Sequence, residues 1–174
     1  MVEVPTRDGV ADAYLSQPDD GGDHAGVLFV IDAFGLRPQI ETMSDRIAQR
    51  GFVVLAPNVF NRAGRAPVLR MPDLSDPENR ASFFESLRPL IKQLTPSRTA
   101  EDGTAYLDYL EDVAPRPFAI TGYCLGGRLA FLGRSEQQSE RQQHDVDDHE
   151  ITAITTSTTV ASTAITRPKS FKIG

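Results

Sequence analysis

The residues around the single cysteine of the chain have the types and the spacing of a nucleophile elbow. Cys124 stands at the centre of a Gly-x-Cys-x-Gly pattern with Gly122 and Gly126, between an apolar run and a predicted helix. Because glycine has no β-carbon, the backbone here can make the sharp strand-to-helix turn that lifts the middle side chain clear of a sheet. The pattern predicts nucleophilic attack by a thiolate on a carbonyl carbon.

A single cysteine has two interpretations. It cannot form a disulfide within the chain, so Cys124 is either a small core residue or a residue kept for its reactivity. Free cysteines are often buried as inert apolar residues. The flanking glycines favour the reactive interpretation, in which the side chain is raised at the N-terminus of a helix whose free N–H groups stabilise the thiolate.

The length and composition of the chain limit what it can be. With 174 residues, of which 40% are hydrophobic, the chain is long enough for one globular domain with one substantial core. The formal net charge is -6 and no basic stretch occurs, so we expect no nucleic-acid partner. The longest apolar stretch, residues 27–31, is too short to span a bilayer, and no apolar run follows the N-terminus. We expect a cytoplasmic protein, a monomer or a weak homodimer, that does not bind membranes.

Short apolar runs predict the strands that position the cysteine. Residues 25–31, 52–56 and 118–121 are continuous apolar runs of the kind found in strands covered on both faces, so we expect them to form a parallel centre. Residues 2–5 and 10–15 alternate, or nearly alternate, between apolar and polar side chains, which favours an antiparallel pair at the N-terminus. The sequence therefore predicts an antiparallel start followed by a βαβ sheet.

Three helices are predicted between these strands. The first ends near Gly51. One of its faces carries the apolar residues Ile40, Met43 and Ile47. The second begins at the pair Asp76-Pro77, a cap followed by proline at the first helical position, and we expect it to be disturbed at Pro89. The third spans about residues 97–114.

The chain changes character near residue 133. Residues 1–133 contain twelve of the thirteen glycines and eleven of the twelve prolines, whereas residues 134–174 hold twelve serines and threonines in 41 positions. This second part opens with a polar run over residues 134–150 that has no apolar periodicity. We therefore divide the chain into an α/β part, residues 1–133, and an atypical tail, residues 134–174, which is expected to be disordered.

Four segments together resemble the dienelactone hydrolase (carboxymethylenebutenolidase) family of the α/β-hydrolase fold. They are residues 27–36 (VLFVIDAFGL), 50–58 (RGFVVLAPN), 77–80 (PENR) and 122–127 (GYCLGG). Gly-x-Cys-x-Gly alone also occurs in glutamine amidotransferases of the flavodoxin-like kind, but the DAFGL segment before a helix favours the hydrolase. The resemblance implies a three-layer α/β sandwich that hydrolyses small esters or lactones and needs no metal and no organic cofactor.

The resemblance also implies roles for individual residues. Cys124 matches the family nucleophile, and the backbone amides of Leu125 and Ala33 match the two donors that hold the oxyanion. Asp32 lies where the family has an acidic residue that is thought to hold the cysteine in its resting state; the alternative is an aspartate that caps a helix. Arg80 lies where the family can place an arginine that binds a substrate carboxylate; the alternative is a solvated helix arginine.

One part of the family pattern does not occur in the chain. In this fold the nucleophile is followed by an Asp and then a His, which in the family stand in Asp-x-x-x-Pro and Gly-His-x-Phe contexts, and neither context follows Cys124. His144 and His149 lie in the polar run, where a solvated loop is favoured over a metal-like cluster or a relocated base. We therefore expect a chain that is truncated or frame-shifted after about residue 133 and lacks the C-terminal half of the hydrolase sheet.

Two functions from different classes remain open at this point. The first is a thiol-dependent hydrolase of small esters or lactones, impaired because the Asp and the His are absent. The second is a non-catalytic α/β fragment that binds a small ligand or a partner through the same pocket. Hydrolysis of an activated ester separates the two.

Overall fold

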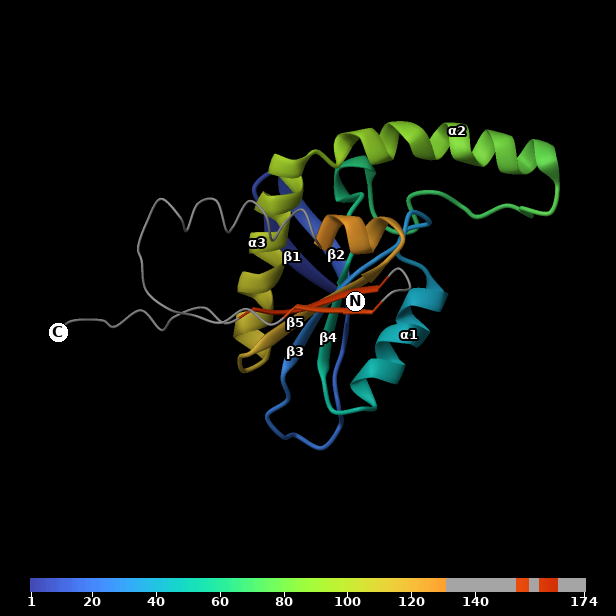
Figure 1. Ribbon diagram of the computed structural model, residues 1–174. Coiled ribbons are helices and arrows are strands. Elements are labelled where there is room, and N and C mark those ends of the chain that lie inside the picture. The colour runs from blue at the N-terminus through green and yellow to red at the C-terminus, as the bar shows by residue number, and fades with distance from the viewer. Residues whose placement is uncertain (131–152, 157–159, 166–174) are drawn as a thin grey trace.

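The three predicted apolar runs form the parallel centre of one mixed sheet (Figure 1). The computed structural model describes residues 1–130, 153–156 and 160–165. Over these residues the strand order is β1-β2-β4-β3-β5-β7-β6. The central strands β4 (Val53–Pro57), β3 (Gly26–Val30) and β5 (Phe118–Tyr123) run parallel. Every residue of β3 and β4 is buried, as expected for strands covered on both faces.

An antiparallel pair at the N-terminus extends this centre on one side. β1 (Val2–Thr6) pairs with β2 (Gly9–Ser16), and β2 pairs antiparallel with β4. Val4 lies opposite Ala11, and both side chains are buried, whereas Val10 is exposed. In β1 the side chains thus alternate between core and solvent, as predicted, whereas Ala11, Asp12 and Ala13 of β2 are all buried, so the predicted alternation does not hold in β2.

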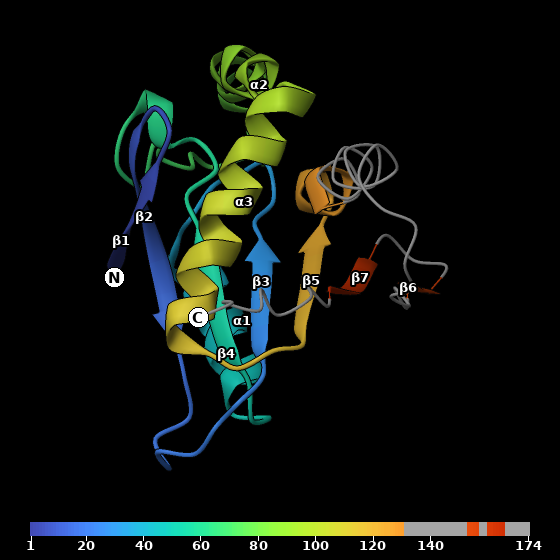
Figure 2. The ribbon, with the colours of Figure 1, turned by 90° about the vertical axis from the view of Figure 1, so that its left-hand side faces the viewer.

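Helices cover both faces of the sheet and one of its ends (Figure 1, Figure 2). α1 (Pro38–Ala48) packs against β2 and β4 on one face, and α3 (Pro96–Val113) packs against β1, β3 and β4 on the other. α2 (Pro77–Gln93) lies beyond the carboxyl ends of the parallel strands. A short 3-10 helix, η1 (Asn61–Ala63), follows β4. The predicted three-layer α/β sandwich of the α/β-hydrolase type is confirmed.

The ends of two helices follow the local sequence signals. Gly51 has φ +88, and its N–H bonds the carbonyl of Ala48, so it ends the first helix in the left-handed conformation that glycine adopts readily. The carboxylate of Asp76 accepts hydrogen bonds from the N–H groups of Glu78 and Asn79 and thereby caps the start of α2.

The predicted disturbance of α2 at Pro89 is wrong, because the helix continues to Gln93. Proline removes the N–H that would bond the carbonyl of Glu85, four residues earlier. Pro89 and Glu85 are both exposed. Water can therefore satisfy this carbonyl, and the helix continues past the proline.

Two further strands extend the sheet beyond the central β5. β7 (Val160–Ile165) pairs antiparallel with β5, and β6 (Ala153–Thr156) pairs antiparallel with β7. No further parallel strand follows β5 in the described part of the chain. Both strands belong to the segment 134–174, so the predicted disorder of this tail does not hold at their residues. The rest of the segment lies outside the described residues, where the disorder, like the boundary at residue 133, stays a prediction.

Candidate active site

Cys124 occupies the sharp turn between β5 and the helix that begins at residue 125. Its backbone has φ +52, and among the described residues no other residue with a β-carbon has a positive φ. A positive φ is costly for such a residue, and strain of this kind concentrates at functional sites. The side chain of Cys124 is exposed instead of packed in the core. The structure therefore has the elbow geometry that the Gly-x-Cys-x-Gly pattern predicts.

The two flanking glycines let the elbow helix press against the end of β3. A β-carbon on Gly122 would lie 2.6 Å from the carbonyl carbon of Gly126 and 2.8 Å from the carbonyl oxygen of Val30. A β-carbon on Gly126 would overlap the carbonyl oxygen of Val30 and lie 2.7 Å from that of Ile31. Real β-carbons essentially never come within 3.0 Å of such atoms, so only glycine fits at both positions.

The register of the sheet brings the loop after β3 beside the elbow. β3 and β5 are parallel neighbours, with Val30 opposite Gly122, and neighbouring strands lie about 4.8 Å apart. Asp32 and Ala33 follow β3 as Cys124 follows β5, so both segments emerge at the carboxyl edge of the sheet. Ligands of open α/β sheets bind at this edge.

Two backbone amides at this edge are available as hydrogen-bond donors. The amide of Leu125 belongs to the first helical residue and has no acceptor within its own helix. The amide of Ala33 donates no hydrogen bond to another described residue. The N–H of Arg128 bonds the carbonyl of Cys124 at 3.4 Å, which closes the first turn of the elbow helix. Free N–H groups beside a nucleophile are what an oxyanion hole requires.

Asp32 is bound within its own loop and does not cap a helix. One carboxylate oxygen of Asp32 accepts the N–H of Phe34 at 2.9 Å, and the Asp32 carbonyl accepts the N–H of Gly35 at 3.2 Å. Gly35 adopts φ +82, which closes this tight turn. The helix-cap alternative for Asp32 is wrong, because the N-cap residue of α1 is Arg37 and no side chain caps that helix.

Arg37 completes this loop, and the sequence analysis did not single it out. Its guanidinium donates to both carboxylate oxygens of Asp32, at 2.7 and 2.8 Å, and to the carbonyl of Gly35 at 3.0 Å. It also lies 5.5 Å from the centre of the Phe34 ring. The only signal in the sequence is an arginine five residues after an acidic residue, which does not by itself predict a contact.

Arg80 is exposed near the start of α2, and none of its side-chain atoms bonds another described residue. Three residues further along the helix, Phe83 is buried and its ring lies 5.8 Å from the ring of Phe34. Residues three apart lie on the same side of a helix. This contact therefore turns the side of α2 that carries Arg80 toward the loop after β3.

The described residues place no histidine at the carboxyl edge of the sheet. His24, the only histidine among residues 1–130, lies in the loop before β3, at the opposite, amino edge. Its ring bonds the carboxylate of Asp20 at 2.6 Å, which raises the pKa of His24 above its ordinary value. His144 and His149 lie outside the described residues. Within residues 1–130, no group of three or more His, Cys, Asp or Glu residues is placed to hold a metal ion.

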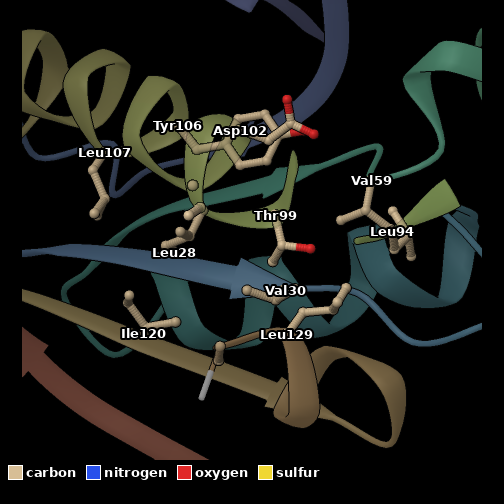
Figure 3. Close-up of a pocket in the computed structure, with 13 residues that line it drawn as sticks. Leu28, Val30, Val59, Leu94, Thr99, Asp102, Tyr106, Leu107, Ile120 and Leu129 are labelled. Carbon is tan, nitrogen blue, oxygen red and sulfur yellow. The ribbon is translucent and has the colours of Figure 1, made fainter. Parts of the chain in front are cut away.

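A cavity of about 50 Å³ lies between α3 and the sheet, on the inner side of the elbow helix (Figure 3). The hydroxyls of Thr99 and Tyr106, two of its lining residues, are buried without a partner among the described residues, and burial raises the pKa of Tyr106. The remaining lining is mostly apolar and includes Leu28, Val30, Ile120 and Leu129. Neither Cys124 nor Ala33 lines this cavity, so it does not contain the exposed thiol.

The fold and the elbow define an α/β-hydrolase-type protein, a sheet with a nucleophile turn at its carboxyl edge. The model of the "Dienelactone hydrolase family" matches residues 11–144, which is more than half of the chain. The chain therefore belongs to the dienelactone hydrolase family. The predicted family is confirmed.

Individual relatives agree with this assignment. A relative from Synechocystis sp., named "Putative carboxymethylenebutenolidase", is 28% identical over 138 residues, which cover 78% of this chain and 53% of the relative. A "Carboxymethylenebutenolidase" from Rhodococcus opacus is 28% identical over 119 residues, which cover 68% of this chain and 42% of the relative. The chain spans about half the length of the curated relatives it matches.

A solved structure shares the fold. The crystal structure described as a "Putative Dienelactone Hydrolase" from Klebsiella pneumoniae superposes with a TM-score of 0.61 at 21% sequence identity. The match covers 76% of this chain and 52% of that protein.

No helix of the described residues is long and apolar enough to cross a membrane.

Proposed function

We propose that this chain carries the nucleophile of a thiol-dependent hydrolase of small esters or lactones, with Cys124 as the attacking residue. The observation that carries the proposal is the positive φ of Cys124, +52. A residue with a β-carbon keeps this conformation only where its surroundings hold it there, and here they hold an exposed thiol at the carboxyl edge of the sheet.

The proposed reaction has two steps. The Cys124 thiolate attacks the ester carbonyl carbon, and the amides of Leu125 and Ala33 stabilise the resulting oxyanion; one such donor is typically worth about 3 kcal/mol. Collapse of this intermediate breaks the bond to the alcohol oxygen, which takes up a proton, and leaves an acyl thioester on Cys124. Water then attacks the thioester, which releases the carboxylic acid and restores the thiol.

Asp32 is proposed as the acidic neighbour of the nucleophile. It follows β3 at the same edge where Cys124 follows β5. A carboxylate beside a thiolate disfavours the thiolate through like-charge repulsion. Asp32→Asn should therefore increase the rate of iodoacetamide alkylation of Cys124 at neutral pH, and an unchanged rate would remove Asp32 from the site.

Arg80 is proposed to bind the carboxylate of an anionic substrate. Its side chain is free among the described residues, and Phe83 turns this side of α2 toward the loop after β3. Arg80→Ala should slow acylation by the anionic ester mono-4-nitrophenyl succinate and leave acylation by the neutral 4-nitrophenyl acetate unchanged. Arg88→Ala, which removes another exposed arginine of α2, is the matched control. Equal effects of the two variants would favour a solvated Arg80.

We expect the second step to be slow. Water needs a positioned base to attack a thioester efficiently, and such a base is typically worth about 10² to 10⁴ in rate. The described histidine, His24, lies at the opposite edge of the sheet and is paired with Asp20. The acyl thioester should therefore accumulate on Cys124.

The test is a burst of 4-nitrophenol on mixing the full chain with 4-nitrophenyl acetate. We expect about one equivalent of product per chain, one added acetyl group by mass spectrometry, and loss of both in Cys124→Ala. No acetylation of Cys124 would leave the non-catalytic α/β fragment as the better description. Sustained turnover that disappears in His144→Ala or His149→Ala would show that the tail supplies the base.

A further inference from the structure

The segment that presents the Ala33 amide is a short loop without regular secondary structure. Residues 31–37 connect β3 to α1, and Ala33 lies between Asp32 and Phe34, whose N–H bonds the Asp32 carboxylate. An oxyanion donor is effective only if its direction is fixed before the reaction begins, because reorganisation during the reaction is costly. Something other than a strand or helix must therefore fix this loop.

Arg37, the last residue of the loop, reaches back to Asp32 near the start of the loop. The guanidinium makes a bidentate ion pair with Asp32, with N–O distances of 2.7 and 2.8 Å, and the two side chains are only 15% and 19% exposed. The same guanidinium donates to the Gly35 carbonyl at 3.0 Å and covers the Phe34 ring. A pair with this geometry is stronger and more directional than an ordinary exposed ion pair.

We propose that Arg37 is the positioning residue of the oxyanion loop. Through Asp32 and Gly35 it ties the two sides of the turn together and holds the Ala33 amide at the carboxyl edge of the sheet, beside Cys124. The use of that amide as an oxyanion donor rests on the proposed function, whereas the clamp itself rests only on the contacts of Arg37.

Hydrogen exchange of the Phe34 and Gly35 amides tests the clamp without any substrate, since both amides bond Asp32. In the full chain, Arg37→Gln should speed their exchange about tenfold, because the hydrogen bonds to a charged group are lost. Amides of β3 should exchange as in the wild type, which shows that the variant is folded. Arg37→Lys should give an intermediate rate, since an ammonium cannot bond both carboxylate oxygens in the planar fork geometry.

Arg46→Gln is the matched control. Arg46 is exposed in the last turn of α1 and makes no side-chain bond to another described residue. The Arg46→Gln variant should leave the hydrogen exchange of the Phe34 and Gly35 amides unchanged. Equal protection of these two amides in the wild type, Arg37→Gln and Arg37→Lys would overturn the proposal.

The catalytic part of the proposal needs a second comparison. Acylation by 4-nitrophenyl acetate uses the oxyanion donors, whereas alkylation by iodoacetamide does not. Arg37→Gln should slow alkylation less than about threefold, because the unpaired Asp32 carboxylate disfavours the thiolate that both reactions use. It should slow acylation about 10- to 100-fold, because only acylation also needs the Ala33 donor in place. Faster amide exchange with unchanged acylation, or equal losses in both reactions, would overturn the positioning role. Faster exchange in a chain whose wild type is never acylated would confirm the clamp and refute the proposed function.

Discussion

Gly126→Ala is the perturbation that tests the elbow most directly. Within a helix, replacing glycine by alanine normally stabilises a protein by about 0.5 to 1 kcal/mol, because alanine loses less backbone entropy on folding. At Gly126 the added β-carbon would overlap the carbonyl oxygen of Val30 and lie 2.7 Å from that of Ile31. Both obstacles are backbone atoms, so no side chain can rotate away, and the elbow helix must move off the end of β3.

The matched control is Gly103→Ala. Gly103 lies within α3, and a β-carbon there would meet no atom within 4 Å. Because both glycines are helical, the entropy gain is common to the two variants and cancels in their comparison. The difference in unfolding free energy is then the cost of the overlap, which is about 1 to 3 kcal/mol for atoms forced into a packed contact. For a chain of this length, this difference in unfolding free energy makes the Tm of Gly126→Ala about 2 to 12 °C lower than that of Gly103→Ala.

Thermal and urea unfolding followed by far-UV circular dichroism measure this difference, and the rate of Cys124 alkylation reports the elbow itself. Gly126→Ala should lower the unfolding midpoint and change the alkylation rate, whereas Gly103→Ala should raise the midpoint and leave alkylation unchanged. Equal stability of the two variants would refute the close approach of the elbow helix to β3, and with it the argument that glycine is required there.

Three further outcomes follow from the structure. Iodoacetamide should modify Cys124 faster in the folded chain than in urea, because the elbow exposes the thiol at a helix N-terminus; slower labelling of the folded chain would indicate a buried structural cysteine. Asp76→Ala should lower the unfolding free energy by about 1 kcal/mol in urea titrations, since two N–H groups of α2 lose their cap, and an unchanged midpoint would refute this cap. Asp20→Asn should lower the pKa of His24 in an NMR titration. The pair with Asp20 raises the pKa of His24 above 6.5, so the stability that this pair contributes is complete below pH 6.5 and is lost as the pH rises through the folded-state pKa. The unfolding free energies of the wild type and the variant should therefore converge toward alkaline pH.

The parallel centre of the sheet could be predicted from the sequence, because a strand that is buried on both faces consists of apolar residues throughout. β3 and β4 are apolar throughout, since neither face of these strands reaches solvent. The start of α2 at its Asp76 cap and the end of α1 before Gly51 could also be predicted, because the unpaired backbone groups at a helix end are satisfied by a few neighbouring residues. The predicted disturbance of α2 at Pro89 was wrong, because the effect of a proline depends on whether the carbonyl that loses its hydrogen bond faces water. The sequence does not show this exposure.

The elbow could be predicted from the Gly-x-Cys-x-Gly pattern by itself, because the close approach of the elbow helix to β3 leaves room only for glycine at positions 122 and 126. Only the tertiary structure decided which side chains meet at the loop after β3. Phe83 meets Phe34 from a helix far along the chain, and the register of β3 against β5 sets Asp32 beside the elbow. The pairing of Arg37 with Asp32 depends on a tight turn that faces the two side chains toward each other. Spacing along the chain does not fix such contacts, because they depend on how the backbone folds between the partners.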